Sequence, residues 1–303
     1  MEACIIGCGA VGCLLAYYLH KATGEPVKAI VRRAEQAEAL RREGARIEGV
    51  PQGLVRVDPH LPGEMPPGSC SHAIIATKAY DAPKAYQEAS RVSRGWIIAA
   101  VNGFPRLPRD ERLAWLVVEY GVARLGDNRF RFNGGRGLVL GAEGSPTLPY
   151  GLARLLEMGG ARVRLVGDVR PYRWGKAAVN AGLNPVTAIL GVENGFVLAS
   201  EYAWSIASRA ALEVAGVARG IGVALPYDPV EYLRSVAEAT RGNTSSMLQD
   251  VLSCRRTEAD EILGEVISTG RRVGASVGTL ETLYFLVKSL EARRERECVK
   301  VRR

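Results

Sequence analysis

The chain has 303 residues, 47% of them hydrophobic and 24% charged, which are the proportions of a globular protein rather than of a disordered or fibrous chain. At roughly 150 residues per domain, this length indicates about two domains. The formal net charge of +8 is compatible with nucleic acid, an anionic membrane or a phosphorylated small molecule as partner. The sequence contains no run of 18 uncharged apolar residues, so it predicts no transmembrane helix.

Short apolar strands alternate with helices through the first half of the chain. Strands are predicted at 2–7, 27–31, 73–76, 96–101, 121–125, 137–140 and 163–166, with short extended pieces over 45–57. Helices are predicted at 10–22, 34–43, 81–91 and 149–158. This alternation is typical of a mainly parallel, doubly wound α/β sheet.

After Gly167 the strand pattern ends, and residues 170–303 show the spacing of apolar residues that is typical of helices. We therefore predict a Rossmann-type α/β domain over residues 1–168 and an all-α domain over residues 169–303. Each part is long enough to bury a core of its own.

A glycine-rich loop, Gly-Cys-Gly-Ala-Val-Gly, lies between the first predicted strand and the first helix. In a dinucleotide-binding loop the first glycine permits the tight turn, the second lets the backbone approach the pyrophosphate, and the third allows close packing of helix on strand. The amide groups at the helix N-terminus then face the phosphates. The candidate cofactor contacts in this loop are Gly7, Cys8, Gly9, Ala10, Val11 and Gly12.

The end of the second strand indicates which dinucleotide is bound. An acidic residue about 20 positions after the loop is typical of NAD sites, but residues 27–33 contain none, and Arg32 and Arg33 occupy its place. A guanidinium group suits the 2′-phosphate of NADPH because it can form paired hydrogen bonds. We predict NADPH as the cofactor and Arg32 as its phosphate ligand. NADH and a merely solvated arginine pair remain the alternatives.

Polar residues also follow two other predicted strands. Lys78 follows strand 73–76, and Asn102 follows strand 96–101. Because ligands of such sheets lie beyond the carboxyl ends of the strands, both residues are candidate cofactor contacts. Taken singly, each is explained equally well as a surface-loop residue.

The first helix of the second half carries a polar face. Lys176 and Asn180 are four residues apart and therefore on one face, which Asn184 would continue, although Pro185 is expected to disturb the helix there. Apolar neighbours would desolvate Lys176, lower its pKa and suit it to proton donation. A surface lysine whose stem lies along the apolar face is the alternative.

Two later polar stretches mark the starts of helices. Residues 243–250 begin Asn-Thr-Ser-Ser, and residues 257–260, Thr-Glu-Ala-Asp, resemble a capping box. Capping alone would explain both stretches, so their spacing does not by itself assign them a catalytic role.

The cysteines do not form the pattern of a metal site. The six cysteines form no CxxC pair and accompany only three histidines, so we predict no metal site and expect buried free thiols.

No secretory signal is recognisable, which leads us to expect a cytoplasmic location. Much of the positive charge lies in residues 293–303, expected to be a solvated, frayed end. We therefore expect neither nucleic acid nor a membrane as partner.

At this point the residues resemble those of the ketopantoate reductase (2-dehydropantoate 2-reductase) family over nearly the whole chain. The resemblance rests on the loop 7–12, Arg32, Lys78, Asn102-Gly103, Lys176, Asn180, Asn184-Pro185, the stretch 243–250, Arg256-Thr257-Glu258 and residues 281–284. The block 243–258 is the most specific part, whereas the glycine-rich loop is common to many families. Val101 departs from the family, which often has glutamine there.

The resemblance implies an enzyme that reduces ketopantoate to pantoate with NADPH, for coenzyme A biosynthesis, and binds its substrate between the two domains. It implies Lys176 as the general acid and places Glu258 near this lysine, the substrate hydroxyl and the cofactor. Asn102 would contact the nicotinamide side of the cofactor, and Lys78 would line the cofactor site. The residues that would bind the substrate, beside Lys176, are Asn180, Asn184, Asn243 and Ser246.

Two other functions are compatible with the residues. One is a β-hydroxyacid dehydrogenase of the same build that acts on another oxo acid, against which the block 243–258 argues. The other is a non-catalytic protein that keeps the fold, either a sensor of NADP or a nucleic-acid-binding protein. The oligomeric state stays open, and a homodimer is compatible with the sequence.

Overall fold

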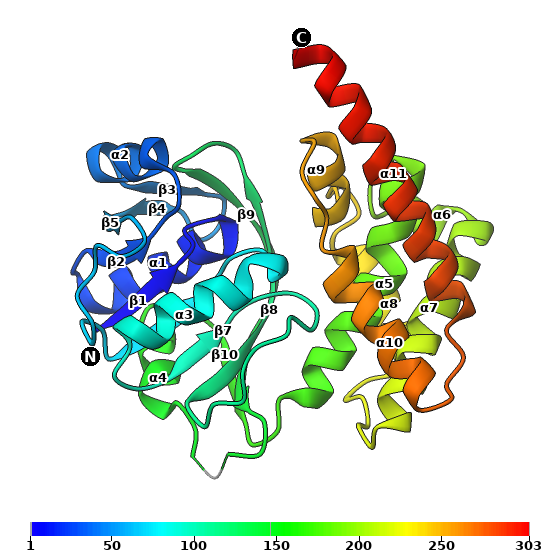
Figure 1. The fold of residues 1–303 in the computed structure, drawn as a ribbon, viewed down its shortest axis with the longest axis horizontal. Helices are drawn as coiled ribbons and strands as arrows, with labels where there is room; N and C mark the ends of the chain where they lie inside the picture. The colour runs from blue at the N-terminus through cyan, green and yellow to red at the C-terminus, as the bar shows by residue number, and fades with distance from the viewer. Residues whose placement is uncertain (1, 146, 303) are drawn as a thin grey trace. The chain divides into compact units, whose positions relative to one another are not determined.

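The computed structural model describes the backbone of residues 2–145 and 147–302 and the side chains as far as Cys298. The chain forms two compact units, shown in Figure 1. The first, called the sheet unit below, comprises Met1–Val101 and Pro105–Val169. The second, called the helical unit, comprises Arg170–Arg303 together with the short segment Asn102–Phe104.

The sheet unit is built on one mixed sheet, in which the six adjacent strands from β8 to β5 in the order below are parallel. Its strands follow the order β4-β3-β9-β8-β7-β6-β1-β2-β5, and β10 pairs with β9. Among the strands of the described residues, the pairs β8–β9 and β3–β4 are antiparallel and the others parallel. The strands are β1 (Ala3–Ile6), β2 (Val27–Ile30), β3 (Ala45–Glu48), β4 (Gly53–Val55), β5 (Val57–His60), β6 (His72–Ile75), β7 (Ile97–Ala99), β8 (Leu113–Arg124), β9 (Arg129–Ala142) and β10 (Val163–Val166).

Helices cover both faces of this sheet, as Figure 1 shows. They are α1 (Ala10–Thr23), α2 (Ala34–Glu43), the short η1 (Ala79–Asp81), α3 (Ala82–Val92) and α4 (Tyr150–Met158). Ile5 packs in the core formed with α1 and α4, whereas its neighbours Cys4 and Ile6 pack in the core formed with α3. Successive residues of a strand thus bury themselves on opposite faces. The predicted doubly wound α/β fold is confirmed.

A long antiparallel hairpin, β8 and β9, replaces the two short strands predicted over 121–125 and 137–140. Glycines and polar residues interrupt its apolar pattern, so the sequence shows only fragments of each strand. The pairing is irregular between Val118 and Val122. At this irregularity Gly135 (φ +143°) lies so close to the partner strand that a Cβ atom would be 2.1 Å from the carbonyl oxygen of Glu119.

The helical unit contains a buried central helix, α5, with the other helices around it. Its helices are α5 (Arg170–Leu190), α6 (Phe196–Ala199), α7 (Glu201–Gly220), α8 (Pro229–Ala239), α9 (Ser246–Leu252), the π-helical turn η2 (Asp260–Gly264), α10 (Glu265–Arg272) and α11 (Gly278–Arg302). Small residues let α5 and α7 approach closely, since a Cβ on Gly182 would lie 2.7 Å from the carbonyl oxygen of Ala207. No strand lies among the residues described in this unit.

Two expectations about these helices are wrong. Helix α5 continues through Pro185, which is buried in its interior. A proline removes one backbone hydrogen bond, and burial on nearly all sides keeps the helix intact despite that loss. Helix α11 continues to Arg302, so the basic C-terminal stretch is helical rather than frayed, although its side chains from residue 299 onward lie outside the described part.

Within the described part of the chain, no helix combines the length and the apolar character that a membrane span requires.

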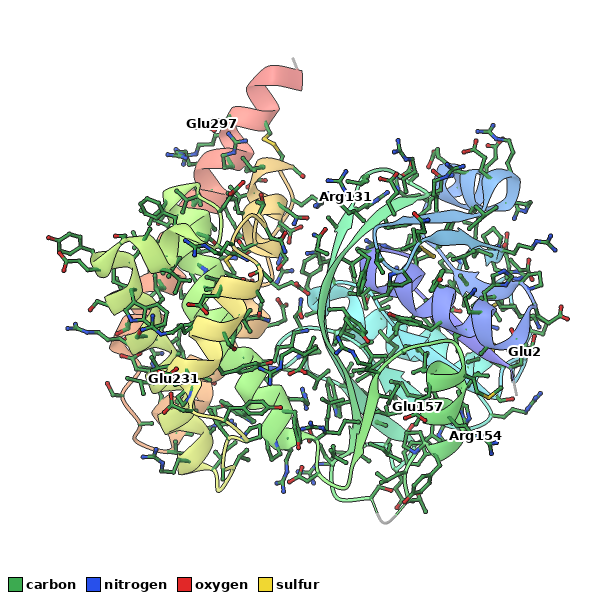
Figure 2. The ribbon with its side chains drawn as sticks, turned by 180° about the vertical axis from the view of Figure 1, so that it is seen from behind. Glu2, Arg131, Arg154, Glu157, Glu231 and Glu297 are labelled. Carbon is green, nitrogen blue, oxygen red and sulfur yellow. A yellow bond between two sulfur atoms is a disulfide. The ribbon has the colours of Figure 1, made fainter. Side chains whose placement is uncertain are left out.

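Four of the six cysteines are paired, so the expectation of free thiols holds only for the buried Cys4 and Cys70. Cys8 bonds to Cys13, with a Cα–Cα distance of 5.1 Å, where the first turn of α1 returns to the glycine-rich loop. Cys254 bonds to Cys298, with a Cα–Cα distance of 6.4 Å. Cys298 follows Glu297, which is labelled on α11 in Figure 2. Helix α11 packs against α9 and so brings together two cysteines that are 44 positions apart.

Replacing Cys298 by serine is expected to lower the free energy of unfolding by about 2–4 kcal/mol, because the disulfide closes a long loop of the unfolded chain. Chemical denaturation followed by circular dichroism measures this loss. Cys254→Ser should cost the same, and the double variant should cost no more than either single one. A Cys298→Ser protein as stable as the wild type would contradict the disulfide.

Candidate active site

The three glycines of the loop 7–12 differ in what a Cβ atom would meet at each position. Gly7 has φ +96°, and a Cβ there would lie 2.7 Å from Cγ2 of Thr77, two residues beyond β6. A Cβ on Gly12 would lie 2.0 Å from the carbonyl oxygen of Gly7. A Cβ on Gly9 would meet nothing within 4 Å. The first and third glycines therefore permit the tight turn and the close approach of α1, while the second leaves open space for a ligand, as dinucleotide binding requires.

The loop is held from both sides, and the start of α1 carries no competing anion. The N–H of Gly7 donates to the carbonyl oxygen of Ile30 at 2.8 Å, and Nε2 of Gln36 donates to that of Cys8 at 2.7 Å. Gly9 is the N-cap residue of α1, no side chain caps this end, and no acidic residue lies in its first turn. These amide groups suit a pyrophosphate, so the loop fits the predicted dinucleotide.

The two arginines after β2 have different partners. Nη1 of Arg32 lies 2.8 Å from Oδ2 of Asp81, and two thirds of the Arg32 side chain is exposed. Arg33 pairs with Asp127 in the β8–β9 turn, which also pairs with Arg124. The hydrogen bond from Arg33 lowers the pKa of Asp127 below its ordinary value. Arg32 therefore presents the more exposed guanidinium group at this strand end.

Lys78 follows β6, is half-buried and caps the short helix η1 in an extended conformation. Strands β6, β1 and β2 are parallel neighbours. The carboxyl ends of these strands therefore bring Lys78, Gly7 and Arg32 to one edge of the sheet, where ligands of doubly wound sheets bind.

In the helical unit, Lys176, Asn180 and Asn184 lie along one face of the uninterrupted helix α5, spaced four residues apart. Lys176 and Asn180 are half-buried, and Asn184 is buried. Because α5 does not break at Pro185, Asn184 continues the face that begins with Lys176.

The buried carboxylate of Glu258 accepts a hydrogen bond from Asn102. Nδ2 of Asn102 lies 3.1 Å from Oε2 of Glu258, which is only 3% exposed. The two residues are 156 positions apart. Asn102 follows β7, yet its contacts place it in the helical unit. The structure thus brings together two of the predicted site residues that no local spacing could link.

At the start of α9, Ser245 does the capping and Ser246 does not. Oγ of Ser245 accepts hydrogen bonds from the N–H of Leu248, at 3.2 Å, and from Oγ1 of Thr187, at 2.7 Å. Ser246 is exposed and Asn243 is half-buried. The hydroxyl of Ser246 is therefore not used as the helix cap.

Asn194 is a candidate that the sequence analysis missed. It is buried, its backbone N–H donates to the carbonyl oxygen of Asn243 at 3.0 Å, and its Nδ2 donates to Oγ1 of Thr240 at 2.9 Å. Its Oδ1 is buried without a hydrogen-bond partner among the described residues. Buried acceptors normally have a hydrogen-bond partner, so this oxygen is a candidate to accept a hydrogen bond from a ligand. Only an asparagine beside a glycine marks it in the sequence.

The turn that carries Glu258 continues into the π-helical turn η2, a geometry that is often found at functional sites. The predicted capping box is only half formed. Oγ1 of Thr257 accepts from the N–H of Ala259 at 3.2 Å, but the N–H of Thr257 donates to Oε1 of Glu291 at 2.7 Å rather than to Asp260.

Asp260 is the centre of a polar cluster next to this turn. Its carboxylate accepts from Tyr284 Oη at 2.7 Å, from Arg256 Nη2 at 2.9 Å and from Lys288 Nζ at 3.2 Å. Burial tends to raise the pKa of Asp260, but the hydrogen bonds from Tyr284 and Lys288 outweigh it, so the pKa lies below its ordinary value.

Comparison with known proteins links both units to one family. A family model described as "Ketopantoate reductase PanE/ApbA" matches residues 3–144, and one described as "Ketopantoate reductase PanE/ApbA C terminal" matches residues 168–291. The 2-dehydropantoate 2-reductase of Pyrobaculum aerophilum is 36% identical over 292 residues, 95% of this chain and 97% of that protein. That of Archaeoglobus fulgidus is 30% identical over 301 residues, 95% and 97% of the two chains.

Solved structures show the same fold. A PanE/ApbA family ketopantoate reductase from Ralstonia eutropha superimposes with a TM-score of 0.85 at 25% identity, covering 97% of this chain and all of that one. A D-mandelate dehydrogenase in complex with NADH and anilino(oxo)acetate gives a TM-score of 0.87 at 21% identity, covering 97% and 99% of the two chains.

Asp260→Asn is expected to destabilise the protein at neutral pH, with a penalty that shrinks in acid. Because the folded-state pKa of Asp260 is lowered, its contribution is complete above the ordinary aspartate pKa and is lost as pH falls through the lowered value. Urea denaturation of both proteins from pH 7 to pH 2 measures the difference. Asp228→Asn, at a helix N-cap where asparagine caps equally well, is the control. A penalty independent of pH would contradict this assignment.

Proposed function

The chain belongs to the ketopantoate reductase family, and from this premise we propose that it reduces ketopantoate to pantoate with NADPH, a step in pantothenate and coenzyme A biosynthesis. The observation that carries the proposal is the hydrogen bond between Asn102 and the buried Glu258, two predicted site residues that both belong to the helical unit. The polar face of α5, with Lys176, Asn180 and Asn184, supplies groups for an oxo acid.

The sheet unit would hold the cofactor. Gly9 leaves room for the pyrophosphate, the uncapped start of α1 offers amide groups to it, and Arg32 offers a guanidinium group to a 2′-phosphate. When bound, the nicotinamide supplies a hydride to the carbonyl carbon of the substrate. Lys78 and the amide of Asn102 would border the cofactor.

Lys176 would act as the general acid. Hydride addition places negative charge on the carbonyl oxygen, which the ammonium group stabilises before Nζ donates a proton to it. The carbonyl thus gains a hydride at carbon and a proton at oxygen to become the alcohol. The carboxylate of Glu258 would keep the ammonium group charged and oriented, since a nearby opposite charge favours the charged form.

Amide and hydroxyl groups would orient the substrate. Asn180 and Asn184 would hydrogen-bond to its hydroxyl and carbonyl oxygens, and the unpartnered Oδ1 of Asn194 would accept from a substrate hydroxyl. The exposed hydroxyl of Ser246 and the amide of Asn243 would bind the carboxylate. This set accounts for a small, polar, anionic substrate, and we place the enzyme in the cytoplasm with no nucleic acid or membrane as partner.

Lys176→Ala is expected to lower kcat by about 100-fold or more, because a positioned general acid contributes a factor of that order. Binding of NADPH, measured by fluorescence titration, should be nearly unchanged. Lys84→Ala, which removes an exposed lysine on α3, is the control and should leave both quantities at the wild-type value.

The same kinetics separate the competing functions. A panel of 2-oxo acids, aliphatic and aromatic, should show ketopantoate as the preferred substrate. Preference for another oxo acid would favour a different dehydrogenase of this fold, and cofactor binding without turnover of any of them would favour a sensor.

Arg32→Ala is expected to raise the KM for NADPH about 10-fold or more while changing the KM for NADH little, because charge-assisted hydrogen bonds to a phosphate contribute roughly 1.5–3 kcal/mol. Arg154→Ala, at an exposed position of α4 labelled in Figure 2, is the control. An equal rise for both cofactors would rule out recognition of the 2′-phosphate by Arg32.

A further inference from the structure

The segment Asn102–Phe104 belongs to the helical unit by its contacts, although the chain on both sides of it belongs to the sheet unit. Only three residues long, it forms no helix or strand of its own. Contacts with the rest of the helical unit hold it, and those of Phe104 involve both its ring and its backbone.

The Phe104 ring packs against two side chains at the start of α5. Its centroid is 4.5 Å from that of Trp174, and the guanidinium carbon of Arg173 lies 5.0 Å from the centroid of the Phe104 ring. Phe104 is half-buried against the apolar core of the helical unit, and Trp174 is buried in it. The residues that contact Phe104 thus precede Lys176 by two and three positions on the same helix.

The backbone of the segment is fixed as well. The N–H of Phe104 donates to the carbonyl oxygen of Glu261 at 2.9 Å, and Nη2 of Arg173 donates to the carbonyl oxygen of Gly103 at 3.3 Å. Gly103 has φ +65°, and a Cβ on it would lie 2.4 Å from the same Glu261 oxygen. Only glycine permits this approach.

Both ends of the segment contact the same turn. Asn102 donates to the carboxylate of Glu258, and Phe104 donates to the carbonyl oxygen of Glu261, three residues further on. A displacement of Phe104 would therefore move Asn102 relative to Glu258. Misplacement of a site group by about 1 Å can cost on the order of 100-fold in rate.

We propose that Phe104, held by Arg173 and Trp174, is a positioning residue that sets the Asn102 amide against Glu258 and thereby supports the reaction without touching the reacting atoms. The inference rests on the proposed function, because it takes Asn102 and Glu258 as parts of the active site. If Phe104 only filled space in the core, its replacement would affect stability alone.

A double-mutant cycle tests the proposal. Phe104→Ala and Asn102→Ala should each lower kcat/KM for ketopantoate by about 10- to 100-fold, and the double variant should lose little more than Asn102→Ala alone, because both changes remove one arrangement. Phe104→Tyr, which keeps the stack, should restore most of the activity. A loss of kcat/KM in the double variant equal to the product of the two single losses would overturn the proposal.

The matched control is another stack of a guanidinium group on an aromatic ring in the same unit. The guanidinium carbon of Arg234 lies 4.4 Å from the centroid of Trp204, a half-buried ring that packs against the same core. Trp204→Ala should lower the melting temperature but leave kcat/KM near the wild-type value. A loss of activity equal to that of Phe104→Ala would identify a general stability effect and overturn the positioning role.

Hydrogen exchange provides a readout that needs no turnover. In the wild type the Phe104 amide should be protected by its bond to Glu261, and Arg173→Gln, a milder change if Phe104→Ala does not fold, should raise its exchange rate at least 10-fold. Unchanged exchange would refute the positioning contacts whatever the substrate. Faster exchange in a protein whose wild type does not reduce ketopantoate would instead refute only the proposed function.

Discussion

The buried carboxylate of Glu258 is the constraint on which the candidate site depends. A polar group taken out of water is costly unless hydrogen bonds compensate it. Asn102 provides one such donor at 3.1 Å, from a strand end that lies 156 positions earlier in the chain. The segment that carries this donor contacts the π-helical turn through Glu261 and the start of α5 through Trp174.

Further polar contacts link the helices of the helical unit to one another. Thr187 on α5 donates to Ser245, which caps α9, and Glu291 on α11 accepts from Thr257. Asp260 joins the turn to α11 through Tyr284 and Lys288. Such networks orient functional groups more strictly than apolar packing does, and the disulfide Cys254–Cys298 adds a covalent link between the same elements.

Much of the fold could be predicted because it is encoded locally. The alternation of apolar strands and helices predicted the sheet unit, and the three glycines of the loop 7–12 indicated a candidate ligand-binding edge. The β8–β9 hairpin was recognised only in pieces, since its irregular pairing and glycines break the period of two. The predicted disturbance of the helix at Pro185 was wrong. Local propensity disfavours proline within a helix, but packing in the core overrode that preference.

The sequence by itself determined which residues share one helix face or one loop: Lys176 with Asn180 and Asn184, and Gly7 with Gly9 and Gly12. Their spacing within a single element is enough to place them together. Only the tertiary structure decided that Asn102 meets Glu258, that Cys254 bonds to Cys298, and that Asn194 is buried with an acceptor that has no partner among the described residues. Contacts between distant elements depend on how whole cores pack, and no local period records that packing.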